Sequence, residues 1–142
     1  MSAPSALPPR LAELAEEFTD VGPSDRLQLL LELSRELPQL PPHLARDCLQ
    51  RVPECQSPLF LAVEVSDDQR VRLYFDAPPE APTTRGLAAI LHAGLDGEAV
   101  PTVLGTPDDF YLHFGLAEAV SPLRLRGVAA MLARIKRTVR QT

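Results

Sequence analysis

The chain alternates between segments with a helical hydrophobic pattern and breaks that contain proline. In four segments apolar residues recur every three or four positions, as on the buried face of a helix: residues 11–18, 25–37, 84–95 and 122–139. Two shorter patterns of the same kind fall at residues 99–104 and 107–114. Pro38 breaks the second segment, whereas Pro107 and Pro122 stand where a helix begins, a position that tolerates proline. The pattern therefore predicts four longer helices and two short ones.

Between the second and third helical segments the pattern changes to that of β-strands. Residues 59–65 and 71–75 are rich in β-branched and aromatic side chains, and the second run alternates apolar and polar positions. The Ser-Asp-Asp-Gln sequence between them favours a turn, so the two strands are expected to form an antiparallel hairpin. A bare hairpin is only marginally stable, so we expect either a third strand from residues just before Cys55 or helices packed across the hairpin. The predicted fold is α+β, with a small antiparallel β-sheet packed against several helices.

The composition fits one globular domain. The chain has 142 residues, of which 45% are hydrophobic, enough for a core. Residues 1–9 are predicted to be a flexible Pro-rich arm, and residues 10–142 a single domain. The N-terminus lacks the charged start and apolar run of a signal peptide. No apolar run approaches the ~20 residues of a membrane helix. We therefore expect a cytoplasmic protein that does not bind membranes.

The net charge of −5 is unevenly distributed along the chain. Residues 121–142 hold six basic residues and no acidic one, which leaves eight basic against 19 acidic residues, a net charge of −11, on the remainder. An acidic body argues against nucleic-acid binding, which needs basic charge clustered over one face. The basic segment is interpreted as the solvated face of the last helix, whose C-terminal end favours cations.

The most distinctive polar segment surrounds Cys55, directly before the first predicted strand. Glu54, Gln56 and Ser57 flank the cysteine, and prolines stiffen the chain on both sides. A structural cysteine is normally buried among apolar side chains, whereas this setting is how a thiol meant to be reached by another molecule would be presented. Local chemistry alone leaves two interpretations open: a reactive thiol and an ordinary loop cysteine.

Neither cysteine belongs to a recognisable metal or redox motif. Cys48 lies seven residues before Cys55, unlike a Cys-x-x-Cys pair, and is predicted to be a packing residue. A zinc site needs about four nitrogen or sulfur ligands, and His43, His92 and His113 are not spaced to complete one. The residues by themselves therefore predict no metal and no cofactor. They predict an α+β domain with one cysteine, Cys55, as the candidate for a reactive thiol.

Four groups of residues carry a resemblance to a known family. They are residues 25–33 followed by Leu37-Pro38, then Cys55-Gln56-Ser57, then residues 84–87, and finally residues 121–127. In this order, and over a span from about residue 11 to residue 135, they resemble the SufE family of sulfur-acceptor proteins in iron–sulfur cluster assembly. The resemblance implies the fold of the IscU-type scaffolds, without their multiple-cysteine metal site.

The resemblance to the SufE family also implies a mechanism. A SufS-like cysteine desulfurase, which depends on pyridoxal phosphate, holds persulfide sulfur on its own cysteine, and the thiolate of Cys55 takes that sulfur over. The sulfur then passes to a SufB-like cluster scaffold. The implied protein is a persulfide carrier and desulfurase activator with no cofactor of its own, and it is not an independent enzyme. Two alternatives stay open: a non-catalytic interaction module, and a thiol redox sensor that uses Cys48 and Cys55.

The resemblance further implies residues that contact the partner. Arg124 matches an arginine that the family carries at the start of the last helix, where its implied role is docking with the desulfurase. Gln56 and Ser57 follow the acceptor cysteine in the matching segment. Glu80 falls where many members have an acidic residue near the cysteine loop. We expect a monomer or a weak dimer, since nothing in the sequence demands a dimer.

Glu54 departs from the family, many members of which have glycine directly before the cysteine. A non-glycine residue disfavours positive φ, and a carboxylate beside a thiol disfavours the thiolate. Both effects predict a thiol that stays unreactive until a basic partner site receives it, and Glu54 is therefore included among the partner-binding residues. Gly86 and Gly127 match family glycines inside helices, where glycine costs roughly 1 kcal/mol relative to alanine. We expect another backbone to pack closely against both.

Overall fold

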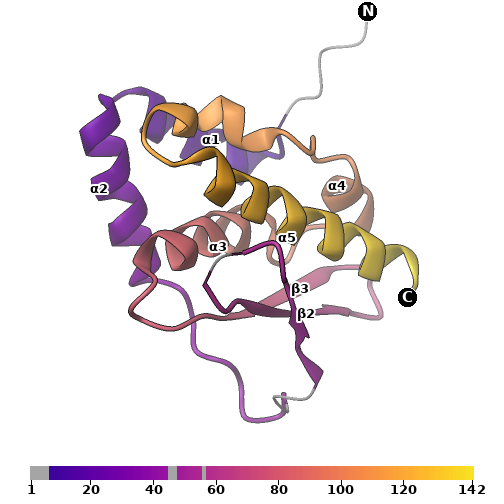
Figure 1. The fold of residues 1–142 in the computed structure, drawn as a ribbon. Helices are drawn as coiled ribbons and strands as arrows, with labels where there is room; N and C mark the ends of the chain where they lie inside the picture. The colour runs from indigo at the N-terminus through magenta and orange to yellow at the C-terminus, as the bar shows by residue number, and fades with distance from the viewer. Residues whose placement is uncertain (1–6, 45–47, 56) are drawn as a thin grey trace, which may run out of the picture.

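The computed structural model describes residues 7–44, 48–55 and 57–142 (Figure 1). Within these residues the α-helices are α1 (Pro9–Thr19), α2 (Pro23–Ser34), α3 (Pro82–Leu95), α4 (Val100–Leu104) and α5 (Pro122–Arg140). The strands are β1 (Gln50–Arg51), β2 (Phe60–Val65) and β3 (Val71–Asp76), and two short 3₁₀ helices are η2 (Phe110–Phe114) and η3 (Leu116–Glu118). The predicted α+β class is confirmed. The predicted arm at residues 1–9 lies largely outside the described residues.

Each of the five α-helices begins with a proline at its first or second position, where the missing N–H leaves no intrahelical bond unmade. These prolines are Pro9, Pro23, Pro82, Pro101 and Pro122. Helix α5 also has a side-chain cap, because the Ser121 hydroxyl oxygen accepts a hydrogen bond from the Arg124 amide at 3.3 Å. The start predicted at Ser121-Pro122 is thus confirmed.

Two of the predicted helices differ from the structure. Helix α2 ends at Ser34, three residues before its predicted end, because the chain then tightens: the amides of Arg35 and Glu36 donate to carbonyl oxygens three residues back. The segment predicted as an α-helix over residues 107–114 is instead the 3₁₀ helix η2, and Phe110 and Phe114 are both fully buried. Two large aromatic anchors fix this short segment without a regular α-helical ladder.

The sheet has three antiparallel strands in the order β1-β2-β3. The predicted hairpin is β2–β3, paired from Phe60 opposite Asp76 to Val65 opposite Val71. Its turn places Gln69 at a φ of 62°, a value that few non-glycine residues adopt. The third strand expected just before Cys55 is β1, which pairs with β2 through only two residues.

The helices cover one side of the sheet in two layers (Figure 1). Helices α3 and α5 contact the sheet, and α1 and α2 pack mainly on α3. In β3 the buried positions Val71, Leu73 and Phe75 alternate with less buried ones, as the period of two requires, whereas in β2 the neighbours Leu61 and Ala62 are both buried. None of the described helices is both long and apolar enough to span a membrane.

Gly86 shows why α2 and α3 approach so closely. A Cβ atom added at Gly86 would lie 2.5 Å from the backbone oxygen of Leu30 on α2. Such a separation is well inside van der Waals contact, so only glycine fits there. The close backbone packing expected at Gly86 is confirmed.

We expect Gly86→Ala to lower the free energy of unfolding by about 1–3 kcal/mol, because the methyl group would push α2 away from α3. Urea denaturation followed by circular dichroism measures the change. The matched control is Gly22→Ala, at a glycine with no other atom within 4 Å of an added Cβ, where the loss should stay below about 1 kcal/mol. Equal losses at the two positions would contradict this account of the helix contact.

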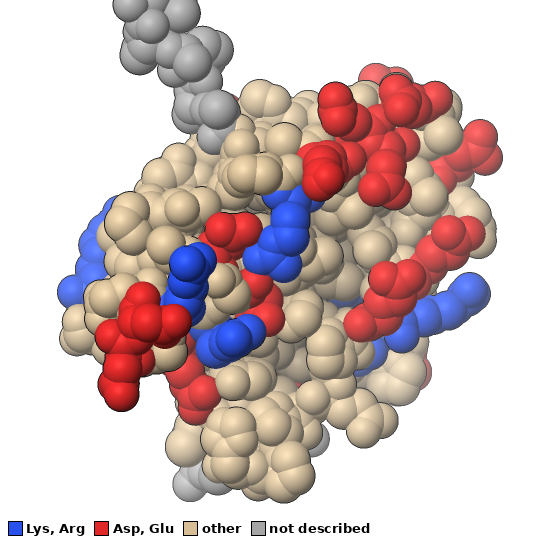
Figure 2. Space-filling view, turned by 180° about the vertical axis from the view of Figure 1, so that it is seen from behind, with Lys and Arg blue, Asp and Glu red and all other residues tan. Residues whose placement is uncertain are grey.

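The uneven charge of the sequence is also uneven in space. Figure 2, which views the molecule from behind, shows acidic side chains gathered on the side where α2 lies. The exposed acidic residues of α1 and α2 are Glu13, Glu16, Glu17, Asp25 and Glu32. The exposed basic residues of α5 are Arg126, Arg137 and Arg140. The outer surface of α1 and α2 is therefore acidic, whereas the exposed surface of α5 is basic.

Candidate functional site

The loop between β1 and β2 carries Cys55 and is closed at its base by a hydrogen bond. The amide of Val52 donates to the carbonyl oxygen of Leu59 at 2.9 Å, and both side chains are fully buried. The Cys55 amide donates to the carbonyl oxygen of Val52 at 3.1 Å, so residues 52–55 form a β-turn. Pro53 takes the second position of that turn, which its fixed φ suits. The loop thus has a fixed base and presents Cys55 near its tip.

The Cys55 side chain is buried against the start of α5, and only 7% of the residue is exposed. A Cβ atom added at Gly127 would lie 3.1 Å from Cys55 Sγ and 3.5 Å from Cys55 Cα. The glycine in α5 therefore makes the space that the cysteine occupies, which confirms the close packing expected at Gly127. In Figure 1 the loop reaches from the sheet to α5. The polar sequence of the loop suggested an accessible thiol. In the structure the loop folds back onto α5, and this contact buries the thiol.

Burial and a neighbouring carboxylate keep this thiol protonated. Loss of solvent raises the pKa of Cys55 from 9.0 to about 11, and the negative charge of Glu54 also raises it. The positive charge of Arg134 acts in the opposite direction and lowers the pKa. The effect predicted for Glu54 is confirmed in direction, although burial is the larger cause. In this conformation the nucleophilic thiolate is a minor species at neutral pH.

Arg134 and Glu54 form an ion pair next to Cys55. Nη2 of Arg134 lies 3.7 Å from Oε1 of Glu54, and the arginine side chain is 20% exposed against 47% for the glutamate. Arg134 is seven residues after Gly127, two helical turns along the same face of α5. The loop is therefore held to α5 mainly by packing at Gly127, because an ion pair at 3.7 Å with a half-exposed glutamate adds little to that closure.

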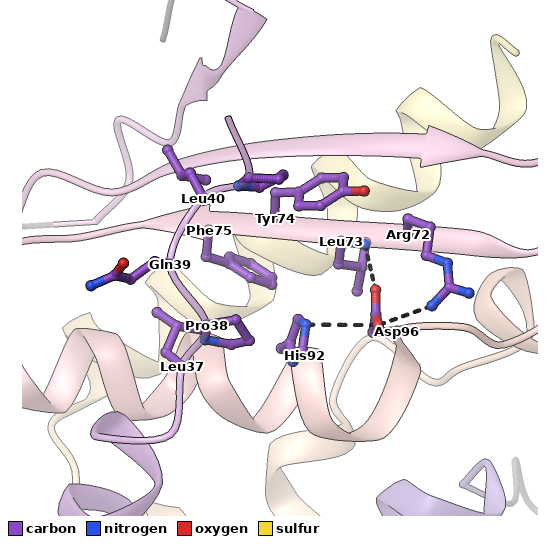
Figure 3. A pocket seen from close by; sticks show the side chains of 11 residues that line it. Leu37, Pro38, Gln39, Leu40, Arg72, Leu73, Tyr74, Phe75, His92 and Asp96 are labelled. Atoms are coloured by element: carbon purple, nitrogen blue, oxygen red, sulfur yellow. Dashed lines mark hydrogen bonds and ion pairs between the residues drawn. The ribbon is translucent and has the colours of Figure 1, made fainter. Parts of the chain in front are cut away.

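A second candidate site, a cavity of about 340 Å³, lies between residues 37–41, β3 and α3 (Figure 3). Its polar centre is Asp96, whose Oδ1 accepts a hydrogen bond from the Leu73 amide at 2.8 Å. Oδ2 of Asp96 lies 3.5 Å from Nη1 of Arg72 and 3.7 Å from Nε2 of His92. The carboxylate is thus used to fasten the end of α3 to the edge of β3. No cysteine lines this cavity, so Cys55 remains the candidate for thiol chemistry.

The His92 side chain makes this attachment sensitive to acid. Burial lowers the pKa of His92, helped by the charge of Arg10 and opposed by that of Asp96. A histidine with a lowered pKa is neutral in the folded state and binds protons more readily when unfolded, so its contribution is present above pH ~6.5 and is lost below it. We expect His92→Gln to weaken the loss of stability between pH 7 and pH 5, measured by urea denaturation at each pH. A pH dependence identical to that of the wild type would contradict this role.

Comparison with known proteins identifies the family. A family model described as SufE, Fe-S metabolism associated domain, matches residues 12–139. The chain belongs to the SufE family. Two proteins from Mycobacterium tuberculosis strains, both named uncharacterized SufE-like protein, are 58% identical to it over 141 residues, 99% of each chain.

Two further proteins are similar to this chain in sequence or in fold. SufE-like protein 1, chloroplastic/mitochondrial, from Arabidopsis thaliana is 30% identical over 127 residues, which cover 89% of this chain and 33% of that protein. The solution structure of a hypothetical protein from Thermus thermophilus superimposes with a TM-score of 0.85 and 42% identity, covering 96% of this chain and 97% of that one. The similarity therefore extends over almost the whole fold.

Arg124, which the sequence resemblance implies as a docking residue, lies where its side chain joins two helices. Its Nη1 donates to Oγ1 of Thr84 at 3.3 Å, and Thr84 is buried in the first turn of α3. Arg124 is half-buried and stands one turn before Gly127, the glycine that contacts Cys55. The structure thus gives Arg124 an intramolecular partner beside the cysteine loop.

The other predicted residues occupy different environments. Ser57 is half-buried beyond the tip of the cysteine loop, Glu80 is exposed in the turn before α3, and Gln56 lies outside the described residues. The prediction for Cys48 is wrong, because this cysteine is exposed. It lies two residues before β1.

Two further observations complete the site. Among the described residues, no group of three or more His, Cys, Asp or Glu side chains is arranged to hold a metal ion.

Sequence reasoning missed the role of Arg134, which it counted with the solvated basic face of α5. The available signal was the spacing of seven residues between Gly127 and Arg134, which places both on the face that the cysteine loop covers.

Proposed function

We propose that this protein is a sulfur acceptor that takes persulfide sulfur from a SufS-like cysteine desulfurase onto Cys55, stimulates that enzyme and delivers the sulfur to a SufB-like iron–sulfur scaffold. The observation that carries the proposal is the position of Cys55 near the tip of a closed hairpin loop in a SufE-family chain. Pyridoxal phosphate belongs to the desulfurase, so this protein needs no cofactor of its own. It acts as a carrier, in the cytoplasm and as a monomer or a weak dimer, and not as an independent enzyme.

The transfer is an exchange between sulfur atoms with no net oxidation. The Cys55 thiolate attacks the outer sulfur of the desulfurase persulfide, a new S–S bond forms at Cys55, and the desulfurase cysteine leaves as a thiolate. The same exchange in the next step moves the outer sulfur from Cys55 to a thiolate of the scaffold. Each step needs one thiolate that attacks and a leaving thiolate that accepts the electron pair.

Burial of Cys55 means that the loop has to leave α5 before this chemistry begins. In the closed position the sulfur atom is packed on Gly127, and the pKa of the thiol is about 11. Release from α5 would restore solvent to the sulfur and bring its pKa back toward 9.0, the ordinary value. The closed loop thereby protects the thiol, and later the persulfide, from reaction with solutes.

The face of α5 beside the loop is the surface we assign to the desulfurase. Leu123 is an exposed large hydrophobic side chain at the start of this face, and Arg126 is exposed further along it. Arginine is enriched among the residues that carry most of the binding energy in protein interfaces. Arg124 would act from the adjoining position, by holding the first turn of α5 against α3 and by contacting the partner.

Sulfur loading tests this proposal directly. Wild-type protein is incubated with a SufS-like desulfurase, cysteine and pyridoxal phosphate, and its intact mass is measured. We expect an adduct of one sulfur atom and a faster desulfurase turnover, both retained in Cys48→Ser. Absence of the adduct in the wild type would overturn the carrier function.

The same measurement separates the two alternatives. A redox sensor would instead lose two hydrogen atoms under oxidant, in a reaction that needs both Cys48 and Cys55. The exposed position of Cys48 and the buried position of Cys55 do not favour direct pairing. An interaction module would stimulate the desulfurase without gaining sulfur.

A further inference from the structure

Arg134 has hydrogen-bonding capacity that the closed loop leaves unused. Its Nε is buried and has no hydrogen-bond partner among the described residues. A buried donor without a partner is costly, because it has given up water and gained nothing in return. Its guanidinium pairs with the half-exposed carboxylate of Glu54 at a separation of 3.7 Å. This contact is longer than a direct hydrogen bond and leaves the guanidinium only partly satisfied.

The position of Arg134 suits an anion on the sulfur of Cys55. Gly127 holds Sγ against α5, and Arg134 lies two turns further along the same face. Its charge already acts on the Cys55 thiol in the resting protein. Glu54, directly beside Cys55 in the chain, competes for the same guanidinium. The loop thus brings one cation, one carboxylate and one sulfur atom together.

We propose that Arg134 is the counter-ion of the sulfur that Cys55 carries, and that it shifts from the Glu54 carboxylate to the persulfide anion when Cys55 is loaded. This inference rests on the proposed function as a carrier. No covalent bond forms or breaks at Arg134, and the proton of the persulfide goes to solvent. The guanidinium offers several N–H donors in a fixed plane, so Nε has a partner in the loaded state that it lacks in the resting state.

Glu54 makes the shift of Arg134 reversible, because its carboxylate binds the guanidinium again when the persulfide is gone. With no anion on the sulfur, the carboxylate holds Arg134 and the loop stays closed over a neutral thiol. With an anion present, two negative groups compete for one guanidinium, and the displaced Glu54 repels the sulfur charge. Glu54 stands where many family members have glycine, so this device belongs to chains that carry the glutamate–arginine pair.

The first test measures the thiol without any desulfurase. In a Cys48→Ser background, the rate of Cys55 alkylation by iodoacetamide is followed from pH 7 to pH 10. We expect Arg134→Gln to lower the thiolate fraction at a given pH about threefold to tenfold, and Glu54→Gln to raise it by a similar factor. Arg134→Lys keeps the positive charge and should restore most of the wild-type profile.

Arg137→Gln is the matched control, because Arg137 lies on the same helix, is exposed and is one turn away from Arg134. It should leave the alkylation profile unchanged. If Arg137→Gln changed the alkylation profile as much as Arg134→Gln does, the effect would come from the overall positive charge of α5. That result would overturn the proposal. An unchanged profile in Arg134→Gln would overturn it as well.

The second test examines the loaded state with inorganic polysulfide as the sulfur donor. The Cys55 thiolate takes one sulfur atom from the polysulfide dianion, which leaves as a dianion one sulfur shorter. Intact mass gives the loaded fraction, which should fall about threefold to tenfold in Arg134→Gln and recover in Arg134→Lys. Equal loading in the wild type and Arg134→Gln would exclude the counter-ion role.

The two tests also keep this inference separate from the proposed function. Neither contains a desulfurase, so both report on Arg134 alone. If polysulfide loading depends on Arg134 but a desulfurase transfers no sulfur to the wild type, the carrier function fails and the contact stands. If a desulfurase loads Arg134→Gln as fully as the wild type, and polysulfide does too, the counter-ion role fails and the carrier function stands.

Discussion

Replacing Cys55 by serine is expected to abolish sulfur loading in the desulfurase assay. A serine hydroxyl is close in size to the thiol, so the loop should still pack on Gly127, but it provides no thiolate for the exchange. The intact-mass adduct should therefore be absent from Cys55→Ser and fully present in Cys48→Ser. Desulfurase turnover should also lose its stimulation, since no acceptor removes the persulfide sulfur.

The control for Cys55→Ser is its binding to the desulfurase. Calorimetric titration should give an affinity within a few-fold of the wild type, because the exposed face of α5 is unchanged. An adduct that persists in Cys55→Ser would place the acceptor elsewhere in the chain. Stimulation that persists without an adduct would instead support the interaction module.

Replacing Gly127 by leucine is expected to displace the cysteine loop and raise the reactivity of Cys55. Even an added Cβ would lie 3.1 Å from Cys55 Sγ, so the remaining leucine atoms need the volume that the cysteine fills. An expelled thiol regains solvent, and its pKa should fall from about 11 toward 9.0, which is roughly 100-fold more thiolate at pH 8. Nucleophilicity falls with pKa, so the net increase in alkylation rate should be about tenfold.

Ala133→Leu is the matched control, since Ala133 is exposed on the solvent side of the same helix. It should leave the alkylation rate at pH 8 within about twofold of the wild type. Circular dichroism checks that both variants remain folded. An unchanged rate in folded Gly127→Leu would show that packing at this glycine does not hold the loop closed.

Much of the fold followed from periodicity, because its elements have strong local signals. The hairpin β2–β3 and the start of α5 are fixed by alternating side chains, turn residues and a capping serine, all of which act within a few residues. The α-helix predicted over residues 107–114 was wrong, because its apolar spacing also suits a 3₁₀ helix held by two buried phenylalanines. The predicted end of α2 at residue 37 was wrong because Leu37 is buried although it lies beyond the helix, so the apolar pattern continues past the last helical residue.

The candidate site was predictable only in part. Cys55 stood out through its polar, proline-flanked setting, and glycine in a helix pointed to close packing at Gly127. The burial of the thiol depends on where the loop folds back, a contact between residues 72 positions apart in the chain that no local pattern encodes. The same holds for the pair of Glu54 and Arg134, whose members looked like ordinary surface charges until the fold brought them together.

The two-residue length of β1 sets how the sheet responds to thermal fluctuations. The hairpin β2–β3 has six paired positions, whereas β1 adds only two, and Gln50 is also tied to Thr138 of α5 by a side-chain hydrogen bond of 3.0 Å. Small cooperative units with few hydrogen bonds open at lower free energy than the core around them. We therefore expect the cysteine-bearing segment to detach and return while the rest of the domain stays folded. Amide hydrogen exchange should thus be faster at Val52 and Cys55 than at Val63 and Tyr74.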